Sequence, residues 1–235
     1  MKLGYSMAVG LLMACLCTID YNFAITSKRT VERSCKCDAC TCNPCSCKTC
    51  TGDCCAKKGK EDFRKAMRQL WNDHGTWTRE YVVAALADLP SVDLAAKRLL
   101  KNQDDIGNAL VPFYGASAGK KLAEMLKEHI LIAVDVVKAA QKNDTKALKI
   151  ADAKWHKNAT DISKFLSSAN QNIKFAQMQA MLFEHLRLLT DIVTSRLKKS
   201  WGDDITFYDS YRNQLNEMAD ELANAIINAL PEKFK

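Results

Sequence analysis

Hydrophobic residues recur with a helical spacing from about residue 61 to the end of the 235-residue chain. Apolar side chains return every three or four positions, which is the period of one face of an α-helix. Proline and glycine are rare and fall mainly between these stretches, where they mark helix ends. The pattern predicts an all-α body of six helices, over residues 61–88, 91–111, 117–141, 145–168, 172–199 and 204–229.

One group of residues occurs three times along this body at a nearly constant spacing. His74, His129 and His185 are 55 and 56 residues apart. An acidic residue precedes each histidine, and another follows six positions later. These acids are Asp73, Glu128 and Glu184 before the histidines, and Glu80, Asp135 and Asp191 after them. The repeat predicts a six-helix bundle of three helical hairpins, over about 64–118, 119–174 and 175–231.

The helical period places all three histidines on the apolar face, with the acids on a stripe beside it. Three interpretations remain open. The histidines can be core residues bonded to neighbouring side chains, ligands of a metal or small-molecule centre shared between hairpins, or acid–base catalysts. Arg79, Gln103 and Asn158 are available as partners for the acids. The ferritin-like Glu-x-x-His pair and the common nucleotide and hydrolase motifs are absent from the sequence, so it favours no particular enzyme.

Residues 1–27 contain an apolar run of about 13 residues, over 7–19. This run is shorter than the roughly 20 residues that cross a bilayer, but it fits the hydrophobic region of a signal peptide. The sequence Leu12-Met13-Ala14-Cys15 is similar to a bacterial lipobox. We therefore expect export to the cell envelope or beyond, either with a membrane anchor on lipidated Cys15 or after ordinary signal cleavage.

Residues 28–60 form a polar segment in which nine of the eleven cysteines lie between positions 35 and 55. They are Cys35, Cys37, Cys40, Cys42, Cys45, Cys47, Cys50, Cys54 and Cys55. The C-x-C and C-x-x-C spacings let neighbouring sulfurs converge on one soft cation. The residues between them are small or polar and cannot build a core. We therefore expect an irregular arm that is held together by cross-links.

Those cross-links can be metal–thiolate bonds or disulfides, and export would favour disulfides. The odd number of cysteines, their short spacing and the lack of an apolar framework weigh against a disulfide arm. The segment resembles metallothioneins, and this resemblance implies binding of zinc, cadmium or copper(I). The hypothesis is a soft-metal-binding protein for sequestration, detoxification or delivery. The alternatives are a disulfide-linked envelope scaffold and, with less support, a metalloenzyme that uses the repeated histidines and acids.

The charge distribution disfavours nucleic acid as a partner. The chain has a formal charge of +7, and residues 28–60 hold eight Lys and Arg against three Asp and Glu. That basic segment has no aromatic residue on which bases could stack. Its lysines instead balance the negative charge of the thiolates. The sequence indicates no particular protein partner.

Residues 64–235 resemble a family of predicted bacterial all-helical proteins of undefined function. The residues that carry the likeness are LWNDHGTWTR (70–79), NQDDIGNALVPFYG (102–115), MLKEHILIAVDVVKAA (125–140), NATDISKFLSSAN (158–170), EHLRLLTDIV (184–193) and MADELANAIINALPEKF (218–234). The resemblance implies an all-helical domain and supplies no catalytic residues. It does not extend to residues 28–60.

Overall fold

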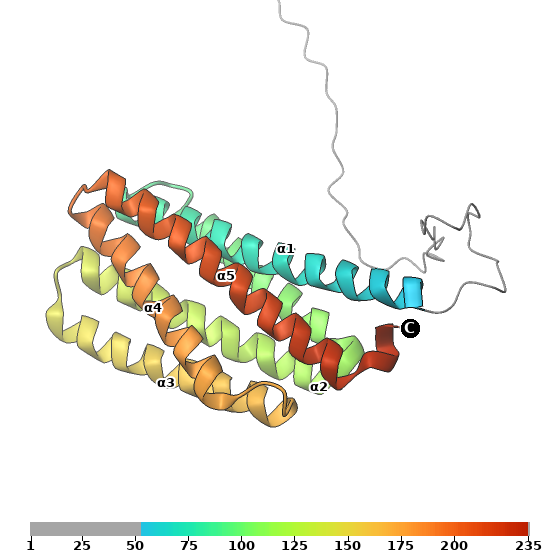
Figure 1. Ribbon diagram of the computed structural model, residues 1–235. Helices are drawn as coiled ribbons and strands as arrows, with labels where there is room; N and C mark the ends of the chain where they lie inside the picture. The colour runs from blue at the N-terminus through green and yellow to red at the C-terminus, as the bar shows by residue number, and fades with distance from the viewer. Residues whose placement is uncertain (1–52, 235) are drawn as a thin grey trace, which may run out of the picture. The chain divides into compact units, whose positions relative to one another are not determined.

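The structure of the protein is a computed structural model that describes residues 53–234, with side chains from residue 58 onward. All regular elements in this range are helices, and the range contains no strand (Figure 1). They are α1 (Asp53–Leu86), α2 (Val92–Gln141), α3 (Thr145–Ala169), α4 (Phe175–Leu197), α5 (Trp201–Ala229) and the short 3₁₀ helix η1 (Pro231–Phe234). The all-α prediction is confirmed for this part of the chain. None of these helices combines the length and apolar character that a bilayer span needs.

Five α-helices occur where six are predicted, because α2 covers both 91–111 and 117–141. Within α2, Gly115 has φ 83° and ψ 165°, outside the helical region. The first arm of α2 (92–114) and its second arm (116–141) lie against each other. The Lys127 ammonium is 2.6 Å from the Asp104 carboxylate, and a Cβ atom on Gly107 would be 2.5 Å from the carbonyl oxygen of Gly119. Glycine is required at Gly107 and Gly119 by this close approach, and at Gly115 by its positive φ.

Helix α1 begins at Asp53, eight residues before the predicted start at residue 61, and its backbone includes Cys54 and Cys55. The hydrophobic pattern could not reveal this extension, because residues 53–60 have no large apolar side chain to mark a buried face. The other seven cysteines of the arm and the whole signal-like segment lie outside the described residues.

The connections after α1, α2 and α4 have the same backbone geometry. Asp88, Asn143 and Lys199 are the described non-glycine residues with positive φ, at 50°, 54° and 58°. In each turn, the amide after this residue donates to the carbonyl five positions earlier in the chain, at 2.9–3.0 Å. This is the 6→1 bond of a Schellman helix end. The three turn residues are 55 and 56 residues apart, the same spacings as the histidines.

Polar contacts fix how α5 lies along α1 (Figure 1). Arg68 Nε donates to Asp220 at 2.7 Å, and Arg64 Nε donates to Asn224 at 2.8 Å. Near the start of α5, the carboxylate of Asp204 is buried and forms ion pairs with Arg79 of α1 and Arg196 of α4. Since residue numbers fall on α1 as they rise on α5, the two helices are antiparallel.

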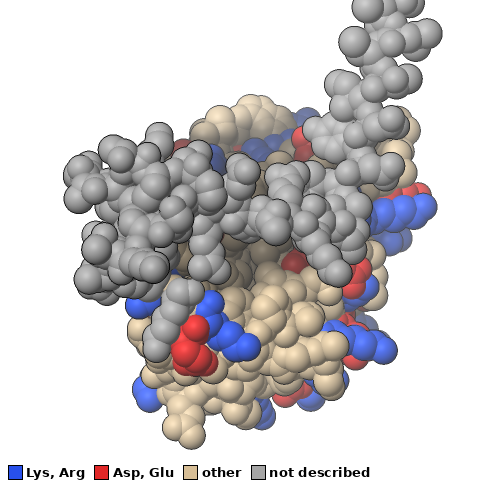
Figure 2. Space-filling model, turned by 90° about the vertical axis from the view of Figure 1, so that its right-hand side faces the viewer, with Lys and Arg blue, Asp and Glu red and all other residues tan. Residues whose placement is uncertain are grey.

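Figure 2 shows that acidic and basic side chains lie near one another on one face, with uncharged surface between them.

Candidate functional site

The three repeated histidines meet in the interior of the bundle. His74 lies on α1, His129 on the second arm of α2 and His185 on α4, and each is no more than 4% exposed. The ring centroid of His185 is 5.6 Å from that of His74 and 6.0 Å from that of His129. The helical spacing predicted that these side chains point inward. The structure adds that they form one histidine centre, with His185 in contact with both of the others.

The hydrogen bonds of His129 define its tautomer. The indole Nε1 of Trp155 donates to His129 Nε2 at 3.1 Å, so this ring nitrogen carries no proton. Nδ1 therefore holds the proton and donates to Asn158 Oδ1 at 2.8 Å. Both ring nitrogens of His129 are satisfied by side chains of α3.

His185 has a similar but looser arrangement with α5. Its Nδ1 lies 3.3 Å from Gln214 Oε1, and its Nε2 lies 3.4 Å from the hydroxyl of Tyr211. Gln214 lies 29 residues after His185, and Asn158 lies 29 residues after His129. Tyr211 and Trp155 each lie 26 residues after their histidine. The contacts therefore repeat in sequence as well as in space.

His74 has an amide partner at the same spacing, but the atom that faces the ring is an amide nitrogen instead of an amide oxygen. Gln103 lies 29 residues later, and its Nε2 is 3.3 Å from His74 Nδ1. Because an amide nitrogen only donates, Nδ1 of His74 must be unprotonated, the opposite of the tautomer at His129. The same Nε2 is 2.8 Å from Leu99 O and 3.1 Å from Asn102 Oδ1, so its two hydrogens are shared among three acceptors and the contact with His74 is the longest of them. Gln103 Oε1 is buried without a hydrogen-bond partner.

The amides also bind a backbone carbonyl four residues before each histidine. Asn158 Nδ2 donates to Met125 O at 3.2 Å, and Gln214 Nε2 donates to Met181 O at 3.0 Å. For His74, two different amides make these contacts. Asn102 donates to Leu70 O at 3.0 Å, and Gln103 contacts the imidazole ring. One or two amides thus tie each histidine helix to the helix that follows it.

Burial keeps all three histidines neutral. Desolvation lowers the pKa of His74 to about 3, with a further lowering from His129, and it lowers the pKa of His129 to about 4. The pKa of His185 is also well below its ordinary value, first because of burial and then because of its two histidine neighbours. Burial likewise raises the pKa of Tyr211, and its contact with Thr78 lowers it by less, so its hydroxyl stays protonated. The centre is therefore an uncharged hydrogen-bonded cluster.

Comparison of the chain with protein-family models, with curated proteins and with solved structures found no match in any of the three.

The six acids of the repeat do not line the histidine centre. Glu80, Glu128 and Asp135 are exposed, and Asp73, Glu184 and Asp191 are partly exposed. Their described partners lie at the surface. Arg187 binds both Glu184 and Asp191, at 2.6 Å and 2.5 Å, and Gln69 donates to Asp73 at 2.8 Å. Arg79, expected to serve these acids, pairs with Asp204 instead. Only Glu128 approaches the centre indirectly, through a 3.3 Å contact with Asn158 Nδ2.

Among the residues described, no group of three or more His, Cys, Asp or Glu side chains is arranged to hold a metal ion. Hydrogen bonds occupy both nitrogens of His129 and of His185, which would have to be broken for either to bind a metal. The three histidines are therefore hydrogen-bonded as core residues are, and the ring nitrogens of His129 and His185 are not free to bind a metal.

Sequence reasoning identified Gln103 and Asn158 as partners, but for the acids rather than for the histidines. It missed Gln214, Trp155 and Tyr211 altogether. The available signal was an amide side chain 29 residues after each of the three repeated histidines, at Gln103, Asn158 and Gln214.

Proposed function

We propose that the protein binds soft metal ions, zinc or copper(I), through the cysteines of residues 35–55. The observation that carries this proposal is the dense C-x-C and C-x-x-C spacing of nine cysteines in a segment whose other residues are small or polar. Nine thiolates suit about three tetrahedral divalent ions when three of the sulfurs bridge two metals. They also suit copper(I), which accepts two or three sulfur ligands. Sequestration, detoxification and delivery are the roles that such binding would serve.

In this proposal the helical bundle is the folded body that carries the cysteine arm. Helix α1 supports it by continuity, since the helix that contains His74 begins at Asp53 and includes Cys54 and Cys55. Export and lipid attachment at Cys15 remain part of the proposal and rest on the signal-like sequence alone. A metal-filled arm in an oxidising compartment would have to acquire its metal before its thiols oxidise.

We assign the histidine centre a structural role in the same proposal, and we infer that the bundle consists of three related hairpins. The equal spacing of the histidines, their amide partners and the positive-φ turn residues supports this inference. Each histidine sits on the first helix of a hairpin and bonds to the second. Their meeting in the interior would fix how the three hairpins pack together, because buried polar groups tolerate few alternative arrangements.

The decisive experiment compares metal content in three forms of the full chain. These are the natural sequence, a variant with all nine cysteines of 35–55 replaced by serine, and a control in which only Cys15 and Cys17 become serine. Native mass spectrometry with elemental analysis should show stoichiometric zinc or copper in the first and third forms and none in the second. Metal-free protein whose cysteines resist alkylation until reduced would overturn metal binding and support the disulfide scaffold.

Metal retained by the nine-serine variant would point to the helical body instead. That outcome would reopen His74, His129 and His185, with Asp73, Glu80, Glu128, Asp135, Glu184 and Asp191, as a second site.

A further inference from the structure

The exposed large apolar side chains of the bundle are concentrated at one of its ends. The connections 87–91, 142–144 and 198–200 all lie at this end, which we call the turn end (Figure 1). Gln141 donates to Asp88 at 3.2 Å, so the first two connections are adjacent. Among the described residues, eight large apolar side chains are exposed, and six of them lie at the turn end: Leu89, Leu94, Ile150, Leu197, Trp201 and Ile205.

These six side chains lie in a thin layer. Leu197 is the last residue of α4, and Ile150 and Ile205 are five and four positions after the first residues of α3 and α5. At 1.5 Å per residue, all six lie within about 8 Å of the ends of their helices. Leu94 is 68% exposed and Trp201 54% exposed, so the bundle does not cover them. A depth of about 5–10 Å is what helices bound at a bilayer surface insert below the headgroups.

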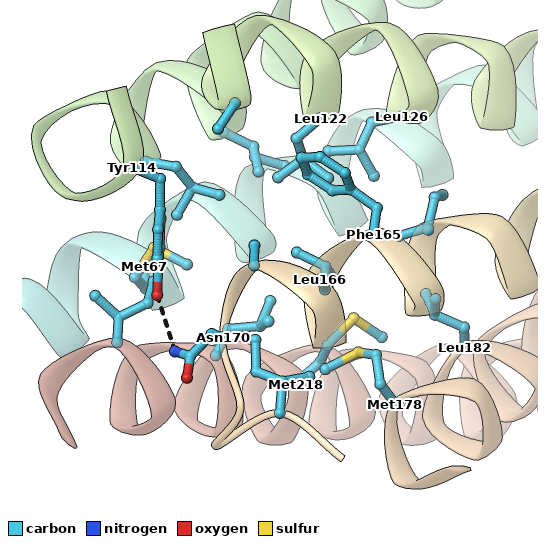
Figure 3. A pocket seen from close by; sticks show the side chains of 18 of the residues that line it. Met67, Tyr114, Leu122, Leu126, Phe165, Leu166, Asn170, Met178, Leu182 and Met218 are labelled. Atoms are coloured by element: carbon cyan, nitrogen blue, oxygen red, sulfur yellow. Dashed lines mark hydrogen bonds between the residues drawn. The ribbon is translucent and has the colours of Figure 1, made fainter. Parts of the chain in front are cut away.

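The opposite end of the bundle covers its apolar side chains better. Three aromatic rings pack on one another there, with centroids 4.8–5.4 Å apart, from Phe63, Phe113 and Phe234. Close by, Asn170 donates to the hydroxyl of Tyr114 at 2.8 Å, among packed apolar side chains (Figure 3). Phe175 is exposed at this end, by 37%. Exposure of apolar side chains is therefore a feature of the turn end rather than of helix ends in general.

Lysines surround Ile150 at the turn end. Residues 138–154, which join α2 to α3, contain five Lys and two Asp, a net charge of +3. Lys146 and Lys154 are one helical turn before and after Ile150, on the same side of α3. Ile150 also lines a surface pocket of about 360 Å³, together with alanines, two aspartates and three lysines, Lys138, Lys142 and Lys154. The pocket combines apolar surface with positive charge.

The same combination occurs at the start of α5. The exposed Lys198 and Lys199 precede Trp201, and the guanidinium of Arg196 lies 5.5 Å from the centre of the indole ring. Tryptophan and lysine are the residues that proteins commonly place at the boundary between lipid and water. Three exposed acids of the turn end already accept hydrogen bonds from the protein, which are Asp88, Asp144 and Asp203.

We propose that the turn end binds the surface of an anionic lipid bilayer. Leu94, Trp201 and Ile205 insert below the headgroups, and the lysines of residues 138–154 face the lipid phosphates. A protein partner would instead favour one contiguous apolar patch, whereas these apolar side chains come from three separate connections with lysines between them. Binding is peripheral, since none of the described helices can span a bilayer. This surface is independent of the metal-binding proposal.

The test uses the full chain with vesicles of phosphatidylcholine, either alone or mixed in equal parts with phosphatidylglycerol. Sedimentation measures binding, and brominated lipids report the position of Trp201. This is the one exposed side chain among the four tryptophans, and Trp201→Phe supplies the background signal. We expect the mixed vesicles to bind more tightly, brominated lipid to quench Trp201, and added salt to weaken binding.

Two sets of variants separate the apolar and the charged contributions. Trp201→Ser combined with Ile205→Ser should weaken binding by at least about tenfold, and Leu131→Ser with Phe175→Ser, exposed outside the turn end, should not. Glutamine at Lys146, Lys149 and Lys154 should weaken binding to the mixed vesicles by about tenfold or more and leave phosphatidylcholine unaffected. The matched control places glutamine at three exposed lysines far from the turn end, Lys65, Lys121 and Lys174.

Absence of vesicle binding would overturn the proposal. Binding without quenching of Trp201, or binding that the Trp201 and Ile205 variant retains in full, would also overturn it, because another part of the chain would then hold the bilayer. Concentration-dependent dimers that this variant abolishes, without vesicle binding, would assign the turn end to a second copy of the chain instead. Equal affinity for the two kinds of vesicle would overturn the role of the lysines. None of these results bears on the cysteine arm.

Discussion

Nε2 of His129 accepts a hydrogen bond from Nε1 of Trp155 at 3.1 Å. Because the indole nitrogen can only donate, this contact fixes the proton of His129 on Nδ1 and directs it to Asn158. A single tryptophan thus sets the chemical state of a histidine on a neighbouring helix.

The tautomer of His129 is the first testable consequence. Long-range ¹H–¹⁵N correlation spectra at neutral pH should show a protonated Nδ1 and an unprotonated Nε2 for His129. His74 should show the reverse, because its Nδ1 faces the amide nitrogen of Gln103. The partly exposed His156 serves as the internal reference. Observation of Nε2–H at His129 would contradict the hydrogen-bond pattern on which the histidine centre is built.

Removal of the Asn158 amide should destabilise the bundle. Asn158→Ala leaves the Nδ1–H of His129 and the carbonyl of Met125 without their partner, and each unsatisfied buried group costs about 1–3 kcal/mol. We expect the free energy of unfolding to fall by about 2–4 kcal/mol in urea denaturation. Gln179→Ala is the matched control, since it removes a single part-buried bond to Thr160 and should cost about 1 kcal/mol. Equal losses in the two variants would show that the amide has no special role.

The stability of the bundle should depend on pH through the histidines. Their pKa values in the folded state are below the ordinary value near 6.5, to about 3 for His74 and about 4 for His129. The unfolded chain therefore takes up protons below pH 6.5 that the folded chain does not. Stability is present above that pH and is lost as the pH falls toward 4. Each histidine contributes a slope of about 1.4 kcal/mol per pH unit.

Urea unfolding between pH 7.5 and 4.5 measures this slope. With His185 included, three protons give about 4 kcal/mol per unit over the steepest region. His74→Leu should reduce the slope by about 1.4 kcal/mol per pH unit, the share of one histidine. A stability that stays flat over this range would mean that the histidines are accessible to protons in the folded protein.

Two glycines should respond oppositely to the same substitution. Gly107→Ala places a Cβ atom 2.5 Å from the backbone oxygen of Gly119, so the arms of α2 must separate, at a cost of about 1–3 kcal/mol. Gly202→Ala, near the start of α5, meets nothing within 4 Å and should stabilise the protein by about 0.5–1 kcal/mol. Thermal unfolding measures both. A harmless Gly107→Ala would show that the two arms are not packed as described.

Much of the fold could be predicted from periodicity, because apolar residues at helical spacing define a buried face wherever a helix is amphipathic. The inward positions of His129 and His185 follow from their apolar neighbours alone. The extension of α1 to Asp53 could not be predicted in this way, since no large apolar residue marks its first turns. The close approach of the two arms of α2 at Gly107 and Gly119 could not be predicted either, because it is a property of the tertiary structure.

The partners of the histidines were harder to predict than their burial. The acids next to the histidines in sequence suggested carboxylate partners, but residues adjacent on a helix point in directions 100° apart. Asp73 and Glu184 consequently remain at the surface, while amides from the next helix reach the rings. Finding Gln214 required comparing residues 29 positions apart, a spacing set by the length of the hairpin rather than by the helical period.

The central claim, that the cysteine arm binds soft metal, is tested most directly by X-ray absorption on full-length protein purified with its native metal. The account predicts zinc or copper with a first shell made only of sulfur, at about 2.3 Å for zinc. A shell of nitrogen or oxygen, or protein without metal whose cysteines are paired as disulfides, would contradict it.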